Sequence, residues 1–150
     1  MGLSSFLTHV RQKLSKAYRR LLAKRPTSGS DYDSVARFIF SKRHFNATRT
    51  IPAAFTPPKN LRLSCFWVDA LPEDSVWQIG DEVAGGPRAK RCLARAELTR
   101  RDIAEAGLHF DDDPGSHSRH VDVCGWPTEK DEIKSVALEL CGRAVLRIRA

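Results

Sequence analysis

Apolar side chains recur at three- and four-residue steps through residues 3–25, which is the spacing of an amphipathic helix. The apolar stripe consists of Phe6, Val10, Leu14, Tyr18, Leu21 and Leu22. Pro26 interrupts the pattern, and residues 27–31 are polar and include a glycine, as linkers do. The pattern therefore predicts a helical arm with its linker over residues 1–30, followed by a separate body over residues 31–150.

The body contains one segment with the pattern of a central strand. In residues 61–71, LRLSCFWVDAL, every second position is apolar at first, and Phe66 and Val68 then make the second face apolar as well. Strands that are buried on both faces show this pattern. Residues 144–149, AVLRIR, alternate between apolar and basic positions and predict a terminal strand.

Shorter segments predict the remaining strands. Residues 108–110 and 119–124 are expected to form strands on either side of an acidic loop. Residues 34–42, SVARFIFSK, fit either a buried strand or one helical turn. Residues 88–98 fit a half-exposed strand with Arg95 on its polar face, although their alanine and arginine content also suits a helix.

Three segments predict helices. Residues 72–83, PEDSVWQIGDEV, carry acids in the first turn, where they favour a helix N-terminus. Thr99 and Asp102 have the spacing of a capping pair and predict a short helix after Thr99. The last helix is expected to open at Thr128 and to stop at Gly142. Its inner stripe would consist of Ile133, Val136, Ala137, Leu140 and Cys141.

Together these elements predict an α+β fold. We expect one compact domain over residues 31–150, with a single small mixed β-sheet flanked by two or three helices and preceded by the amphipathic helix. A chain of 150 residues has the size of one ordinary domain and can bury a substantial core. Its hydrophobic content of 41% and charged content of 29% are globular values, which argues against disorder throughout.

Charge separates the arm from the body. The formal net charge is +7, from 25 Lys and Arg against 18 Asp and Glu. Residues 1–30 hold seven of these cations and no acid, which leaves 18 charges of each sign in residues 31–150. The seven cations are Arg11, Lys13, Lys16, Arg19, Arg20, Lys24 and Arg25. Such an arm could bind nucleic acid, an anionic membrane surface or a groove on a partner protein, or its apolar stripe could simply cover the body.

The cysteines and the hydrophobic runs indicate the setting of the protein. Cys65, Cys92, Cys124 and Cys141 are widely spaced and form no C-x-x-C pair, the spacing of zinc ribbons and redox motifs. No stretch approaches the roughly 20 apolar residues of a membrane span, and the first residues lack the apolar run of a secretory signal. We therefore expect a cytoplasmic protein with reduced thiols and no transmembrane segment.

The densest group of chemically active side chains lies in residues 114–132, PGSHSRHVDVCGWPTEKDE. In a strand, His120, Asp122 and Cys124 point to one side and the two intervening valines to the other. His120 and Asp122 could serve as an acid–base pair or, with His117, bind a divalent metal. Cys124 lies about 13 Å along the strand from His120, too far for a nucleophilic pair. Alternatively, the valines face the core and the polar side chains face water.

A second candidate lies in residues 41–49, SKRHFNATR. Arg43 and His44 belong here to the densest basic patch of the body. The patch could bind phosphate, and His44 could pair with His120 for acid–base cleavage of a phosphodiester if the fold brings the two together. Alternatively, these residues form a solvated basic turn.

Two stretches of the sequence carry a resemblance. The first is HFN…IPAAFTPP…LRLSCFWVDAL and the second is SRHVDVCGWPTEKDEIKSVALELCGRAVL. Both are similar to stretches of small bacterial proteins with HF…PAAFTPP and SRHxxVxGWPxEK patterns. The resemblance covers most of residues 36–146, leaves out the basic arm and brings no activity, ligand or catalytic residue with it. It implies a bacterial, cytoplasmic setting and argues against a transit peptide.

The sequence leaves two functions open. The first is a non-enzymatic binding or accessory module, in which the arm attaches to nucleic acid, an anionic surface or a partner protein. His44 and residues 117–126, including Arg119 and Trp126, would then supply the recognition surface, although Trp126 could instead staple the last helix. The second is a small hydrolase or nuclease that uses the histidines and the aspartate of residues 117–122. The first needs no cofactor, whereas the second could use a divalent metal.

Overall fold

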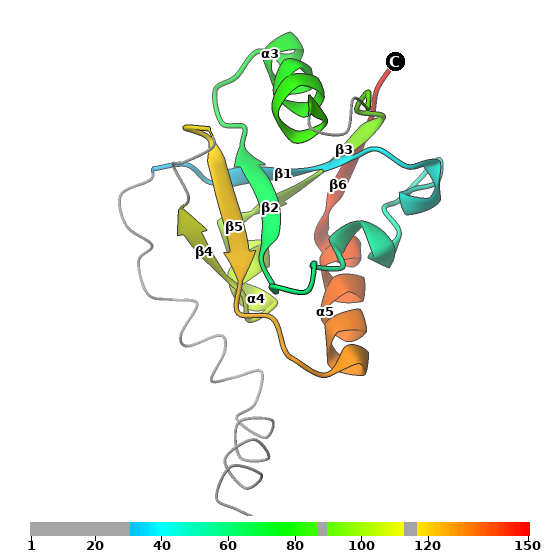
Figure 1. The fold of residues 1–150 in the computed structure, drawn as a ribbon, viewed down its shortest axis with the longest axis vertical. Coiled ribbons are helices and arrows are strands. Elements are labelled where there is room, and N and C mark those ends of the chain that lie inside the picture. The colour runs from blue at the N-terminus through cyan, green and yellow to red at the C-terminus, as the bar shows by residue number, and fades with distance from the viewer. Residues whose placement is uncertain (1–30, 87–89, 113–116) are drawn as a thin grey trace, which may run out of the picture.

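The computed structural model of the protein describes residues 31–86, 90–112 and 117–150, so the predicted helical arm lies outside the described residues. The described residues form one six-stranded sheet in the order β4-β5-β2-β1-β3-β6 (Figure 1). The strands are β1 (Ser34–Ile39), β2 (Leu63–Trp67), β3 (Ala94–Thr99), β4 (His109–Asp112), β5 (His120–Cys124) and β6 (Val145–Ile148). The predicted central strand is β2, which lies inside the sheet between β5 and β1.

Every neighbouring pair in this sheet is antiparallel, so the α+β class is confirmed and the expected mixed sheet is wrong. A parallel pair would need a crossover connection, and here each strand instead lies beside one that runs the opposite way. β1 pairs with β3 along its whole length. Its pairing with β2 is shorter and joins Val35 to Trp67 and Ala36 to Phe66. β1 and β2 therefore separate beyond Ala36, inside the sheet.

Helices cover both faces of the sheet. The α-helices are α3 (Glu73–Ile79), α4 (Arg100–Glu105) and α5 (Lys130–Arg143), with short helical turns η1 (Lys42–His44), η2 (Pro52–Phe55) and η3 (Gly80–Ala84). In the view of Figure 1, α3 lies above the sheet and α4 and α5 lie below it. None of the helices in the described part of the chain is long and apolar enough to cross a membrane.

The larger core lies between the sheet and α4, α5 and η2. Val121 and Val123 of β5 are fully buried in it, as the alternation of β5 predicts. α5 contributes Val136, Ala137 and Leu140, three members of the predicted inner stripe, to the same core. Each fully buried aliphatic side chain of this size stabilises the fold by about 1.5–3 kcal/mol relative to exposure. The stripe of α5 therefore explains why this helix packs on the sheet.

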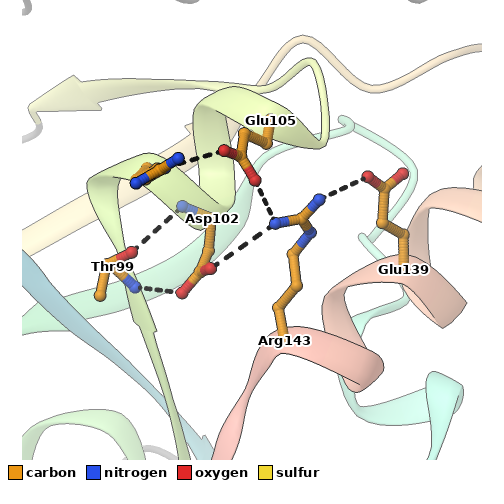
Figure 2. Close-up of polar contacts among 6 residues, drawn as sticks. Thr99, Asp102, Glu105, Glu139 and Arg143 are labelled. Atoms are coloured by element: carbon orange, nitrogen blue, oxygen red, sulfur yellow. Dashed lines mark hydrogen bonds and ion pairs between the residues drawn. The ribbon is translucent and has the colours of Figure 1, made fainter.

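The ends of α4 and α5 are held by polar contacts (Figure 2). Thr99 and Asp102 form the predicted capping box, in which each side chain accepts a hydrogen bond from the other residue's backbone N–H. Arg143 of α5 reaches across to Glu105 and Asp102 of α4 and back to Glu139 of its own helix. These contacts fix the two helices to each other.

The predicted bounds of the last helix need correction. The helix begins at Lys130 and not at Thr128, and Glu129 occupies the N-cap position without a side-chain capping bond. It also continues past Gly142 and ends at Arg143, with Ala144 as the C-cap. A side chain at Gly142 would meet open space, so this glycine is not needed for a close approach.

The opposite face carries a smaller core under α3 and η3. It contains Phe38, Phe66, Val76, Trp77 and Cys92, with further partly buried side chains around them. The prediction that the polar face of β3 is half-exposed is wrong at Arg95, which lies on this side of the sheet. Arg95 is only 3% exposed, lies 4.5 Å from the centre of the Trp77 ring and bonds Glu73 and Glu97. Residues 88–98 looked half-exposed because the helix that covers Arg95 comes from another part of the sequence.

Candidate functional site

The polar side chains of β5 meet a serine on β2. In the antiparallel register, Ser64 lies opposite Asp122 and Phe66 lies opposite His120. Ser64, His120 and Asp122 therefore share the face of the sheet that carries the smaller core. His120 and Asp122 have side chains that are only 11% exposed, so the interpretation that this polar face is solvated is wrong.

One nitrogen of His120 faces both Ser64 and Asp122. Nε2 lies 2.7 Å from Ser64 Oγ and 3.6 Å from Asp122 Oδ1. In a catalytic triad, the acid instead holds the other imidazole nitrogen, Nδ1, while Nε2 takes the proton of the serine. The geometry therefore gives a Ser64–His120 hydrogen-bonded pair, with Asp122 placed beside the same nitrogen.

Arg62 joins Asp122 to the edge of the sheet. Its Nε donates to Asp122 Oδ2 at 2.9 Å, and its Nη2 donates to Asp111 Oδ2 at 2.7 Å. Hydrogen bonds to Asp111 and Asp122 raise the pKa of Arg62 above its ordinary value. We call Arg62, Ser64, Asp111, His120 and Asp122 the polar cluster. Any metal ion bound by Asp122 would have to compete with this arginine.

Cys124 follows on the same strand but takes no part in an acid–base pair. Its side chain is buried, and this burial raises the pKa of the thiol above its ordinary value. A reactive cysteine needs the opposite shift, because the thiolate is the nucleophile. The sequence-based exclusion of a Cys124–His120 pair is consistent with this environment.

His117 lies close to the polar cluster, against the same aromatic ring as His120. The ring centres of His117 and His120 lie 6.1 Å and 5.2 Å from that of Phe66. The Nδ1 atom of His117 accepts the backbone N–H of Arg119 at 3.0 Å, so this nitrogen is already engaged. Among the residues that the structure describes, no three His, Cys, Asp or Glu side chains are arranged to hold a metal ion.

His44 lies on η1, at the end of the loop that follows β1. Its backbone N–H donates to Ser41 and its carbonyl accepts from Ile51. Burial, followed by the positive charge of Arg37, lowers the pKa of the His44 imidazole. His120 contacts Ser64, Asp122 and Phe66, among other groups. A two-histidine acid–base pair of His44 and His120 stays a prediction.

The remaining predicted binding residues have different surroundings. Arg43 is exposed on η1. Arg119 donates to the carbonyl of Asp69 and lies 4.2 Å from the centre of the Tyr32 ring, so it holds the start of β1. Trp126 is buried and donates from Nε1 to the carbonyl of Val123, so the alternative of an exposed stacking ring is wrong. The seven cations of residues 1–30 lie outside the described residues.

A cavity opens where β1 and β2 separate. Arg37 occupies the gap, with Nε donating to the carbonyl of Ala54 at 3.1 Å and Nη1 donating to that of Ser64 at 2.9 Å. The cavity has a volume of about 160 Å³, and we call it the β1–β2 cleft. It is lined by Arg37, Phe38, Phe40, Ser64, Phe66 and Ala84. Ser64 therefore belongs both to the cleft and to the polar cluster.

Sequence reasoning missed Arg37 and Ser64, although both leave a signal. Each is a polar residue within a largely apolar strand, SVARFI for Arg37 and LSCFW for Ser64. A buried polar group needs a partner, so such an interruption indicates a contact with another part of the fold. The identity of that contact depends on the strand order, which the sequence did not supply.

A larger cavity of about 580 Å³ lies between α3, η3 and the end of β6. Its lining includes Glu73, Asp81 and Trp77. Glu73 bonds Arg95, and Asp81 bonds Arg149, with N–O distances of 2.8 Å in both pairs. Both acids thus hold the fold together, so the smaller β1–β2 cleft is the better candidate for a recognition site.

No protein-family model matches the chain, and neither does a curated protein or a solved structure. A functional proposal for the chain therefore rests on the geometry of the cleft and of the polar cluster.

Proposed function

We propose that this protein is a non-enzymatic binding module and that the β1–β2 cleft is its recognition site. The observation that carries the proposal is a cavity whose lining combines Arg37 and Ser64 with three phenylalanines and Ala84. Binding sites typically combine apolar walls with a few placed polar groups. The cleft volume of about 160 Å³ lies below the roughly 300–1,000 Å³ of sites for drug-sized molecules. The ligand would therefore be a small molecule or one side chain of a partner.

The polar groups of the cleft are held in place before any ligand arrives. Two hydrogen bonds to backbone carbonyls fix the guanidinium of Arg37. The hydrogen bond with His120 at 2.7 Å orients the hydroxyl of Ser64. Preorganised groups lose little conformational freedom on binding, which favours affinity from few contacts. This rigidity supports recognition at the cleft.

The basic arm adds a second element to this proposal. Its seven cations within residues 1–30 would attach the module to nucleic acid, an anionic surface or a partner protein. In this view, the arm supplies attraction and the domain supplies recognition. A cytoplasmic setting would suit both parts.

Nuclear magnetic resonance of the full ¹⁵N-labelled chain tests the proposal. Neutral, cationic and anionic fragments of a few heavy atoms are titrated in turn, and at least one class should cause saturable shifts around Ser64 and Phe66. Ala84→Leu, which places a larger side chain at the cleft wall, should abolish these shifts. Ala47→Leu is the matched control, because Ala47 is exposed on the loop after η1. No saturable shift in any class, or shifts that survive Ala84→Leu, would contradict the proposal.

A hydrolase is the second candidate, because of the Ser64–His120 pair. A distance of 2.7 Å between Ser64 Oγ and His120 Nε2 suits a nucleophile and its general base. Ser64 Oγ would bond to an acyl or phosphoryl centre while His120 takes the hydroxyl proton and later passes it to the departing group. The position of Asp122 beside Nε2, rather than Nδ1, counts against this reaction.

A serine-directed fluorophosphonate probe distinguishes the two functions. The hydrolase predicts covalent labelling of Ser64, found by mass spectrometry and lost in His120→Gln. The binding module predicts no labelling above that of Ser64→Ala treated in the same way; Ser34→Ala, which keeps Ser64, is the matched control. Labelling of Ser64 that depends on His120 would replace our proposal with the hydrolase.

A further inference from the structure

We infer that β6 is an interaction surface and that its partner is β6 of a second copy of this chain. Pairing of the two edge strands would join two sheets into one continuous sheet across a two-fold axis. The inference goes beyond the proposed function, because it does not involve the β1–β2 cleft. Its basis is the exposure, the backbone direction and the charge balance of β6.

β6 offers backbone groups to a further strand. It lies at one end of the strand order and pairs with β3 on one side (Figure 1). The backbone N–H of Arg149, just after β6, donates at 3.0 Å to the carbonyl of Leu93, just before β3. Successive residues of an antiparallel strand direct these groups to opposite sides, so those of Leu146 and Ile148 point away from β3. Among the strands that the structure describes, none lies on that side of β6.

β6 also concentrates exposed apolar side chains. Three large apolar side chains are exposed in the described part of the chain, and two of them, Val145 at 54% and Ile148 at 48%, belong to β6. The third, Leu138 at 62%, lies on the outer side of α5. Exposed apolar side chains on an edge strand favour its pairing with another strand.

The charges of β6 permit the approach of a second copy. Arg147 bonds Glu97 at 3.2 Å, and Arg149 bonds Asp81 at 2.8 Å. Each of these arginines thus has a carboxylate of its own chain, and two β6 strands would meet as nearly neutral edges. The same pairing removes the attraction that would favour a strongly acidic partner over a second copy.

The other edge of the sheet has a different character. β4 ends with Asp111 and Asp112, which are both exposed. Charged side chains on an edge strand oppose pairing, and in a β4–β4 pair these acids would lie close to their own copies. We therefore expect association at the β6 edge alone, which gives a closed dimer and not a growing chain of molecules.

Charge also selects the register of the proposed pair. Two registers keep the faces of the two sheets aligned and overlap most, with either Leu146 or Arg147 opposite its own copy. Arg147 opposite Arg147 would set like charges against each other, which destabilises a strand pair. With Leu146 on the axis, Val145 lies opposite Arg147 of the second copy. Leu146 already packs against the larger core, so the leucine pair would extend that core across the axis.

Sedimentation equilibrium of the full chain tests the association. Because β6 has only four residues, the interface is small and the dimer should be weak, so the chain is studied from about 10 µM to about 1 mM in about 0.15 M salt. We expect a reversible equilibrium between monomer and dimer. A monomer over the whole range would overturn the inference. Species whose mass rises beyond that of a dimer would overturn it too, because they would indicate head-to-tail pairing of β6 with β4.

Two lysine substitutions test whether β6 forms the interface. Ile148→Lys should weaken the dimer about tenfold or more, because it adds a charge at the paired edge. Leu138→Lys is the matched control, since it makes the same change of charge at an exposed apolar residue of α5, and it should change the affinity less than about twofold. Equal losses in the two variants would contradict the inference, because they would indicate general repulsion between the copies.

Disulfide cross-linking tests the register without weakening the dimer. Opposite residues of an antiparallel pair have Cα atoms about 4.5–5.5 Å apart, which a disulfide can bridge. Mild oxidation of Leu146→Cys should therefore link two copies through position 146, as mass spectrometry of the linked peptide would show. The unchanged chain, whose four cysteines are free, gives the background. Linkage that is faster in Arg147→Cys, or absent from both variants, would overturn the pairing centred on Leu146.

Discussion

Asp111 and Asp122 offer a matched test of what the polar cluster does, because both carboxylates bond the same arginine. Arg62 lies 2.7 Å from Asp111 and 2.9 Å from Asp122. Their side chains differ in exposure, at 54% for Asp111 and 11% for Asp122. Replacing each with asparagine removes one charge and keeps the side-chain shape. The two variants therefore compare one interaction at two levels of burial.

The expected costs follow from that difference in exposure. An exposed ion pair stabilises a fold by about 0–1 kcal/mol, so Asp111→Asn should cost less than about 1 kcal/mol. A charge-assisted hydrogen bond to a buried group contributes about 1.5–3 kcal/mol. The amide introduced by Asp122→Asn would keep an acceptor oxygen for Arg62 but lose the charge, so this substitution should cost about 1.5–2 kcal/mol. The difference of about 1 kcal/mol is roughly fivefold in the folding equilibrium.

Urea denaturation of the full chain measures these costs. All three tryptophans, Trp67, Trp77 and Trp126, are buried, so their fluorescence reports unfolding. With a typical slope of about 2 kcal/mol per molar urea, Asp122→Asn should lower the midpoint by about 0.8–1 M. Asp111→Asn should lower it by less than about 0.5 M.

The result also bears on Asp122 as a candidate for catalysis or metal binding. If Asp111→Asn costs as much as Asp122→Asn, exposure does not set the strength of these pairs and the reasoning fails. If Asp122→Asn leaves the stability unchanged or raises it, Asp122 does not serve the fold. Residues kept for chemistry often stabilise a protein when replaced, and that outcome would favour the hydrolase.

Four further predictions concern other parts of the fold. Arg37→Gln should raise the pKa of His44 but not to its ordinary value of 6.5, because burial, the larger cause of the lowered pKa, remains. NMR titration of the imidazole measures this pKa, and an unchanged value would contradict the prediction. The pKa of His44 in the folded protein lies below 6.5, so the neutral imidazole contributes to folding stability above pH 6.5. This contribution is lost as the pH falls through the folded-state pKa, and urea midpoints measured across pH 5–7 should show the loss. Thr99→Ala should cost about 1 kcal/mol in thermal or urea unfolding, because it removes the capping bond to Asp102, whereas Thr99→Ser should cost much less. Burial raises the pKa of Cys65 to about 12, so a thiol reagent at pH 8 should label this cysteine only after unfolding. Rapid labelling of Cys65 in the native protein would contradict this, because it would show that the thiol is accessible.

Much of the fold could be predicted because its patterns are local. The apolar faces of β2, the inner stripe of α5 and the Thr99–Asp102 capping box each depend on residues a few positions apart. Backbone geometry alone sets those periods, so a sequence is sufficient to find them. The alternation of β5 likewise placed Val121 and Val123 in the core.

The errors arose where a distant segment changes the surroundings. Arg95 looked exposed from its own strand, but α3 covers it and supplies Glu73. The sequence allowed Trp126 to be exposed, but its side chain is buried and its indole N–H donates to the carbonyl of Val123. The polar face of β5 looked solvated, whereas Arg62 and Ser64 come from the segment around β2 to bond it.

The sequence by itself determined the α+β class, most of the strands and helices, and the concentration of the net positive charge in residues 1–30. Only the tertiary structure decided the antiparallel strand order and the candidate site. Ser64 and His120 are 56 positions apart and meet because β2 and β5 pair in one particular register. Arg37 lines a cavity because β1 leaves β2 after two paired residues. Strand register and separation depend on the packing of the whole sheet, and no local period in the chain encodes them.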